Sequence, residues 1–169
     1  CQFCQVYGLT ETAGAGTILE PQDHDPARGK LRSCGKPAAS AAVRILGHNG
    51  EDVPANTVGE ILYRSGSLMK GYWKNDQATA KAIQGGWFYT GDAGYLDEEG
   101  YLFIHDRIKD MIVSGGENVY PAEVENALFS LPQIADVAVV GVPDEKWGEA
   151  VKAVIVLKPG ETANEEEII

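Results

Sequence analysis

Basic residues are scarce in this sequence. Only 14 lysines and arginines stand against 25 acidic residues among 169, which gives a formal net charge of −11. Proteins that bind a phosphate backbone need a dense basic surface, and an anionic membrane surface would repel this chain. We therefore expect no nucleic acid partner.

Long apolar runs and paired cysteines are also lacking. The best apolar run, residues 134–142, contains Asp136 and falls short of the roughly 18 residues that a membrane span needs. No signal-peptide pattern is present. Three cysteines, an odd number, argue against a disulfide scaffold and fit a reducing compartment. We expect no transmembrane segment and a cytoplasmic location.

The cysteines leave one metal-binding alternative open. Cys1 and Cys4 form a C-x-x-C pair that could bind zinc together with His24 and Cys34. His24 and Cys34 lack the spacing of a ligand pair. The simpler interpretation is that the three cysteines are reduced thiols.

Methionine is scarce, whereas glycine is abundant. The only methionines are Met69 and Met111 and position 1 is Cys, so we expect a segment of a longer protein. Twenty glycines are about 12% of the chain, against a usual level of about 7%, and they follow no collagen period. With 44% hydrophobic residues, the composition predicts a turn-rich globular protein of one domain or two small ones.

Charge divides the chain into two parts. Residues 1–109 hold 13 acids and 11 bases, whereas residues 110–169 hold 12 acids and 3 bases. Two structural units therefore meet near the charged run 106–110.

Local patterns differ between the two parts. The first part predicts strands over 41–46 and 59–64, a hairpin over 95–104, and a short helix from 76 to 83 with Asp76 as its N-cap. Such antiparallel segments are typical of barrel-like folds. The second part predicts the order strand, helix, strand, strand, a small α+β unit, over residues 111–113, 121–131, 134–142 and 150–157. The capping-box spacing from Thr162 to Glu165 predicts one more helix.

Three segments join glycine to fixed polar groups. In residues 7–12, YGLTET, a hydroxyl beside a carboxylate suits Mg²⁺ and phosphate, although a polar strand end would look the same. In residues 87–92, WFYTGD, a carboxylate at a tight turn can accept both hydroxyls of a ribose, or the turn only connects strands. The run DRIKD at 106–110 is followed by SGGEN at 114–118. These residues are either a solvated connector or a segment whose glycines let the backbone flex or a ligand pass close to the main chain.

Taken in order, the motifs resemble those of the adenylate-forming superfamily, which includes acyl-CoA synthetases, amino-acid adenylation domains and firefly-type luciferases. The resemblance covers essentially the whole chain. It rests on YGLTE at 7–11, GEI at 59–61, YW at 72–73, WFYTGD at 87–92, DRIKD at 106–110 and SGGENVYPAEVE at 114–125. The GGENVYP form and VPDEKWGE at 142–149 look most like fatty or aryl acyl-CoA synthetases.

The resemblance implies a mixed α+β fold with two incomplete domains. Residues 1–109 would form the C-terminal, barrel-like part of the large AMP-binding domain. Residues 110–169 would begin a mobile lid, with Lys109 as the hinge. The implied activity uses ATP and Mg²⁺ to convert a carboxylic acid to acyl-AMP and then transfers the acyl group to CoA. Alternatives are an amino-acid adenylation domain that serves a carrier protein, or a non-catalytic module with the zinc set above.

The resemblance also assigns roles. Tyr7 would stack near adenine, Gly8 would also belong to the ATP- or AMP-binding site, Thr10 would contact phosphate and Glu11 would bind Mg²⁺. Asp92 would bind the ribose hydroxyls and Arg107 the same sugar, while the segment Ser114, Gly115 and Gly116 would line the CoA tunnel. The family's glycine-rich phosphate loop and its late catalytic lysine match no segment of this sequence. We therefore expect the 169 residues alone not to catalyse adenylation.

Overall fold

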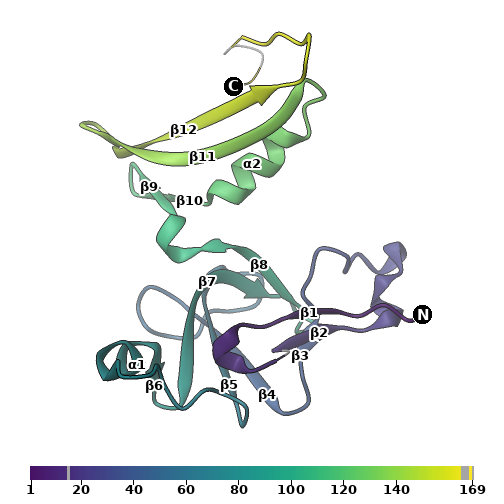
Figure 1. The fold of residues 1–169 in the computed structure, drawn as a ribbon, viewed down its shortest axis with the longest axis vertical. Coiled ribbons are helices and arrows are strands. Elements are labelled where there is room, and N and C mark those ends of the chain that lie inside the picture. Colours follow the sequence, from purple (N-terminus) through teal and green to yellow (C-terminus); the bar gives the residue numbers. More distant parts are fainter. Residues whose placement is uncertain (15, 165–167, 169) are drawn as a thin grey trace. The chain divides into compact units, whose positions relative to one another are not determined.

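The computed structural model describes residues 1–14, 16–164 and 168, and the chain divides into two compact units, Cys1–His105 and Asp106–Ile169 (Figure 1). Each unit is described by itself below. Across the described residues, no helix is long and apolar enough to cross a membrane.

The first unit is built from two antiparallel sheets. The smaller has the order β1-β2-β3, with β1 (Gln5–Tyr7), β2 (Thr17–Leu19) and β3 (Lys36–Pro37). The larger has the order β4-β5-β7-β6 and β8 paired to β7, with β4 (Ala41–Leu46), β5 (Gly59–Ser65), β6 (Ile83–Gln84), β7 (Trp87–Leu96) and β8 (Leu102–Arg107). The strands predicted over 41–46 and 59–64 and the hairpin around residues 97–100 are thereby confirmed.

Helices in this unit are short. They are the α-helix α1 (Asp76–Ala82) and the 3₁₀ helices η1 (Thr10–Thr12), η2 (Pro21–His24) and η3 (Pro26–Arg28). The predicted helix is present, but its N-cap is Asn75 and not Asp76. The side chain of Asn75 accepts a hydrogen bond from the N–H of Ala78, at 3.0 Å. Asn and Asp are equally good N-caps, so two adjacent candidates cannot be ranked by residue type.

The core of the first unit lies on the larger sheet. Ile45, Ile61 and Leu102 form a buried cluster, and Tyr7 is among the side chains that pack against it. The Tyr7 ring is therefore anchored by apolar burial, the main stabilising term in folding.

The second unit contains a four-stranded sheet and the nine-residue α-helix α2. The sheet has the order β10-β9-β12-β11, with β9 (Ile112–Ser114), β10 (Glu117–Val119), β11 (Ile134–Asp144) and β12 (Gly148–Leu157); η4 (Ile108–Asp110) precedes it and α2 (Pro121–Phe129) lies between β10 and β11. Pro121 occupies the first turn of α2, as predicted, and the helix ends before Pro132.

The predicted strand order of this unit was incomplete. β10 pairs antiparallel with β9, so that Asn118 lies opposite Val113. Three residues, two of them polar, carry no alternation from which a strand could be predicted. The helix predicted from Thr162 to Glu165 lies partly outside the described residues.

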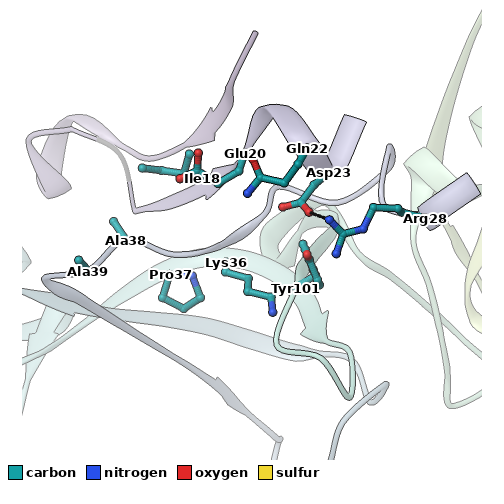
Figure 2. A pocket seen from close by; sticks show the side chains of 10 residues that line it. All are labelled: Ile18, Glu20, Gln22, Asp23, Arg28, Lys36, Pro37, Ala38, Ala39 and Tyr101. Atoms are coloured by element: carbon teal, nitrogen blue, oxygen red, sulfur yellow. Dashed lines mark ion pairs between the residues drawn. The ribbon is translucent and has the colours of Figure 1, made fainter. Parts of the chain in front are cut away.

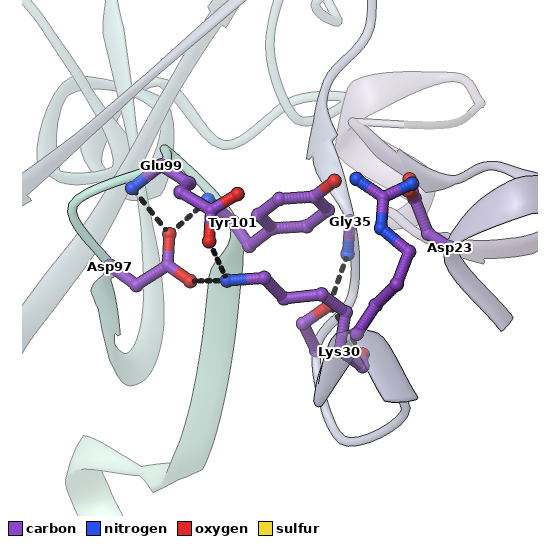
Figure 3. A network of polar contacts seen from close by, with 8 residues as sticks. Asp23, Lys30, Gly35, Asp97, Glu99 and Tyr101 are labelled. Carbon is purple, nitrogen blue, oxygen red and sulfur yellow. Dashed lines mark hydrogen bonds and ion pairs between the residues drawn. The ribbon is translucent and has the colours of Figure 1, made fainter. Parts of the chain in front are cut away.

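A lysine network ties the β7–β8 turn to the rest of the first unit. The Lys30 ammonium lies 2.6 Å from a carboxylate oxygen of both Asp97 and Glu99 (Figure 3). Asp97 also accepts hydrogen bonds from the N–H groups of Glu99 and Tyr101. Two ion pairs and two hydrogen bonds thus stabilise this turn.

The network predicts acid sensitivity. Burial raises the pKa of Asp97, but bonds from Lys30 and from backbone N–H groups outweigh burial and hold it below its ordinary value of 3.8. A depressed folded-state pKa stabilises the fold above the ordinary value, and this contribution is lost as pH falls through the folded-state pKa. Urea unfolding between about pH 3 and pH 6 should therefore show a smaller loss of stability toward acid in Asp97→Asn than in wild type.

The exposed neighbour in the same turn provides the control. Glu98→Gln should keep the wild-type acid dependence, because Glu98 is exposed. Equal slopes for wild type and Asp97→Asn would contradict the assignment.

Candidate active site

The loop after β1 folds back on itself. Its ends are joined by a bond from the N–H of Gly16 to the carbonyl of Tyr7, at 2.7 Å. The buried Thr12 hydroxyl donates to the carbonyl of Leu9 and accepts from its N–H, at 2.8 and 2.9 Å. A Cβ at Gly8 would collide with the carbonyl of Gly14, so only glycine fits there. The loop therefore places Thr10 and Glu11 in the short 3₁₀ turn η1.

Tyr7 and Asp92 meet although they are 85 residues apart. The Tyr7 hydroxyl donates to Oδ2 of Asp92 at 2.6 Å. Burial, and then the Asp92 carboxylate, raise the pKa of Tyr7, so that the phenol stays protonated and remains a donor. Two residues predicted separately for the site are thus brought into direct contact.

An irregularity in β7 orients Asp92. The register between β5 and β7 shifts between Glu60 and Leu62. Within it, the Thr90 hydroxyl donates to the carbonyl of Ile61 at 2.7 Å and accepts from the N–H of Asp92 at 3.1 Å. Such bulges redirect side chains, and here Asp92 is buried, with 5% exposure.

Glu11 is held by a residue to which the sequence assigned no role. The Tyr72 hydroxyl donates to Oε1 of Glu11 at 2.9 Å, across 61 residues. The N–H of Met69 donates to the Glu11 carbonyl at 2.8 Å. Burial and the Glu11 carboxylate raise the pKa of Tyr72, which keeps it a donor. The YW pair at 72–73 was noted as a motif, but only the tertiary fold brings it to Glu11.

Glu60 is a second residue without an assigned role in the sequence. Its carboxylate accepts from the N–H of Gly91 at 3.3 Å. Burial raises its pKa, and the nearby Asp92 adds to that effect. Glu60 belongs to the GEI segment at 59–61, so the motif marked the position without indicating its function.

The remaining predicted site residues lie in or at the start of the second unit. Arg107 ends β8, and its N–H donates to Oδ1 of Asp106 at 2.7 Å. Oδ2 of Asp106 accepts from the N–H of Ala122 at 2.9 Å, in the first turn of α2. Lys109 lies in η4 with a side chain that is 75% exposed, 3.9 Å from Asp110. Asp106 therefore supplies the side-chain cap that the N-cap residue of α2 does not provide.

The glycine turn between β9 and β10 packs against an aromatic ring. Gly115 has φ +61°, and a Cβ there would lie 2.7 Å from Cε3 of Trp147. The N–H of Gly115 donates to the carbonyl of Trp147 at 2.8 Å. Trp147 is 49% exposed, and the Lys146 ammonium lies 4.4 Å from its ring centroid. The glycine turn thus packs directly against the connection between β11 and β12.

Substituting the two glycines should separate backbone strain from packing. Gly115→Ala and Gly116→Ala both place alanine at positive φ, which costs about 1 to 2 kcal/mol. Only Gly115→Ala adds a clash with Trp147, for a further cost of about 1 kcal/mol. We expect the larger loss of unfolding free energy in Gly115→Ala by chemical denaturation. Equal losses would contradict the packing role of Gly115.

The alternative zinc set is not assembled. Cys1 and Cys4 are exposed, and Nδ1 of His24 lies 3.0 Å from the carbonyl of Glu20. In the part of the chain that the structure describes, no three His, Cys, Asp or Glu side chains are grouped so as to hold a metal ion. The zinc hypothesis is therefore wrong for these residues.

A separate polar hollow of about 430 Å³ lies elsewhere in the first unit (Figure 2). Its wall includes the ion pair between Arg28 and Asp23, at 2.6 Å, and the Tyr101 ring. It is lined by Ile18, Glu20, Gln22, Asp23, Arg28, Lys36, Pro37, Ala38, Ala39 and Tyr101. Since none of these is a predicted site residue, this hollow is distinct from the Tyr7–Asp92 site.

Two family models match the chain. Residues 1–73 match the AMP-binding enzyme family, and residues 123–169 match the AMP-binding enzyme C-terminal domain. The chain belongs to the AMP-binding, adenylate-forming superfamily. Its mixed α+β architecture is that of the end of the AMP-binding domain followed by the C-terminal domain.

Members of this superfamily are similar over most of the chain. A fatty acid–[acyl-carrier-protein] ligase, ScoC, of Streptomyces coeruleorubidus is 45% identical, covering 95% of this chain and 31% of the relative. An indoleacetate–CoA ligase of Aromatoleum aromaticum is 49% identical, covering 94% and 30%. The o-succinylbenzoate CoA synthetase of Bacillus subtilis, solved with its acyl-adenylate intermediate, has a TM-score of 0.85 at 41% identity, covering 94% and 32%. The chain thus spans about a third of the length of the relatives it matches.

Proposed function

We propose that these residues form part of an ATP-dependent acyl-CoA synthetase. The observation that carries the proposal is the contact between Tyr7 and Asp92, which joins the YGLTE and TGD motifs in one site. The similarity to CoA ligases and to a synthetase solved with an acyl-adenylate supports it.

The reaction has two steps. A substrate carboxylate oxygen attacks the α-phosphorus of ATP, and pyrophosphate leaves with the formation of acyl-AMP. The CoA thiol, after loss of its proton, then attacks the acyl carbon, and AMP leaves. Such chemistry depends on positioning and charge neutralisation more than on covalent help from the protein.

Within the first unit, three residues would position the nucleotide. Asp92 would accept the ribose hydroxyls, and Thr10 would donate to a phosphate oxygen. Glu11 suits Mg²⁺, because this ion is often bound by one carboxylate together with substrate phosphates. When bound, Mg²⁺ would neutralise charge on the phosphates. A B. subtilis o-succinylbenzoate CoA synthetase structure, solved with ATP and magnesium, is 40% identical to this chain.

Residues of the second unit would serve the same nucleotide and the thiol. Arg107 would contact the ribose, and Lys109 would be the pivot of the lid. Ser114, Gly115 and Gly116 would line the path of the CoA pantetheine, since glycine allows close approach of a ligand to the backbone.

Carboxylate-dependent exchange of pyrophosphate into ATP tests the first step in the complete protein. We expect exchange with a panel of fatty and aryl acids, and thioester formation when CoA is supplied. No exchange with any acid would contradict the proposal. A thioester formed only on a carrier protein would favour the alternative acceptor, which the name of the ScoC relative makes worth testing.

The isolated 169 residues provide a further comparison. We expect no exchange above background, because the family's phosphate loop and catalytic lysine are not among them. Turnover by the isolated chain would contradict this expectation.

A further inference from the structure

The hydroxyl of Tyr7 donates its hydrogen bond to a carboxylate of the protein. It lies 2.6 Å from Oδ2 of Asp92, and Asp92 is 5% exposed. The ring packs against the cluster of Ile45, Ile61 and Leu102, so apolar contacts fix where the hydroxyl points. The donor is thus placed by the core of the unit.

A buried carboxylate needs such a donor. Hydrogen bonds to a charged group contribute more to stability than bonds between neutral groups do. A buried charge without a hydrogen-bond partner destabilises the fold. Two hydrogen bonds help to orient Asp92: the bond from its N–H to Thr90 fixes the backbone, and the bond from Tyr7 fixes the carboxylate. Since burial and Asp92 raise the pKa of Tyr7, the donor persists at physiological pH.

We infer that Tyr7 is a positioning residue whose hydroxyl holds the Asp92 carboxylate in the orientation that receives the ribose hydroxyls. This inference rests on the proposed function, because it takes Asp92 as the ribose ligand. Tyr7 acts through Asp92, so its hydroxyl matters only while the nucleotide has ribose hydroxyls to offer.

Tyr7→Phe in the complete enzyme tests this, because phenylalanine keeps the ring and its core contacts. Pyrophosphate exchange is measured with ATP and with 2′,3′-dideoxyATP. We expect the KM for ATP to rise about tenfold, as for loss of a hydrogen bond to a charged group, with kcat within about twofold. With dideoxyATP the penalty of Tyr7→Phe should fall to about twofold or less, because the coupled contact is already absent.

Tyr101→Phe is the matched control. Tyr101 is buried, at 2% exposure, whereas Tyr7 is half-buried. As in Tyr7, burial and a neighbouring carboxylate, here that of Asp23, raise the pKa of Tyr101, but Tyr101 lies at the polar hollow. Loss of the Tyr101 hydroxyl in Tyr101→Phe should leave the KM for ATP unchanged. If Tyr7→Phe reduces the yield of folded enzyme, equilibrium binding of AMP and 2′,3′-dideoxyAMP to the folded fraction gives the same comparison.

The outcomes separate the two proposals. An unchanged KM in Tyr7→Phe, or the same penalty with both nucleotides, would overturn the positioning role while exchange by wild type upheld the proposed function. No exchange by wild type would overturn the proposed function, and the inference with it.

Discussion

Asp92→Ala is expected to raise the KM for ATP by about ten- to a hundredfold, which corresponds to loss of a charge-assisted contact of about 1.5 to 3 kcal/mol. The carboxylate is buried at the irregular part of β7, where the Thr90 hydroxyl accepts from the N–H of Asp92 and the Tyr7 hydroxyl donates to the carboxylate. Alanine removes the proposed acceptor for the ribose hydroxyls and also leaves the Tyr7 hydroxyl without this partner. Steady-state exchange kinetics at varied ATP measure the effect.

Asp23→Ala is the control for Asp92→Ala. Asp23 is equally buried, at 5% exposure, but its carboxylate pairs with Arg28 at the polar hollow. Its removal should lower stability without changing the ATP requirement. An unchanged ATP requirement in Asp92→Ala would contradict the ribose assignment.

Lys109→Pro is expected to reduce thioester synthesis by about a hundredfold while pyrophosphate exchange stays within about threefold, because proline fixes φ near −65° and would block rotation of the proposed lid. Lys109 is well exposed in η4, close to the boundary between the two compact units. A hinge needs only a few residues that can absorb a change in φ and ψ without opening a core. Separate assays of the two half-reactions measure the split.

Lys109→Ala distinguishes backbone from side chain. It removes the ammonium and its 3.9 Å pair with Asp110 but leaves the backbone free, so both half-reactions should continue. Equal losses of both reactions in Lys109→Pro would indicate misfolding and not a blocked hinge. No loss of either would place the pivot elsewhere, for example at the boundary between His105 and Asp106.

Sequence predicted the fold where a local pattern was long enough. The alternation over 41–46 and the Pro121 start of α2 specified their elements directly. β10 was missed because it is three residues long and exists through its pairing with β9. The N-cap of α1 was misplaced by one residue because Asn75 and Asp76 are chemically interchangeable as caps.

The site was predicted as parts but not as contacts. Tyr7, Glu11 and Asp92 were each singled out from their motifs. Glu11 contacts Tyr72, which is 61 residues away, and Asp92 contacts Tyr7, which is 85 residues away. No local spacing encodes such contacts. Likewise, the packing of Gly115 against Trp147 could not be predicted from local spacing, and the approach of Gly115 to CoA stays a prediction.

Transfer of an oxygen label tests the central claim most directly. The complete protein is given ATP, CoA and a carboxylic acid labelled with ¹⁸O in its carboxyl group, and the products are analysed by mass spectrometry. Attack of the carboxylate on the α-phosphorus predicts AMP that carries one ¹⁸O, together with the acyl-CoA thioester. Unlabelled AMP, or ADP with the label in inorganic phosphate, would contradict adenylation.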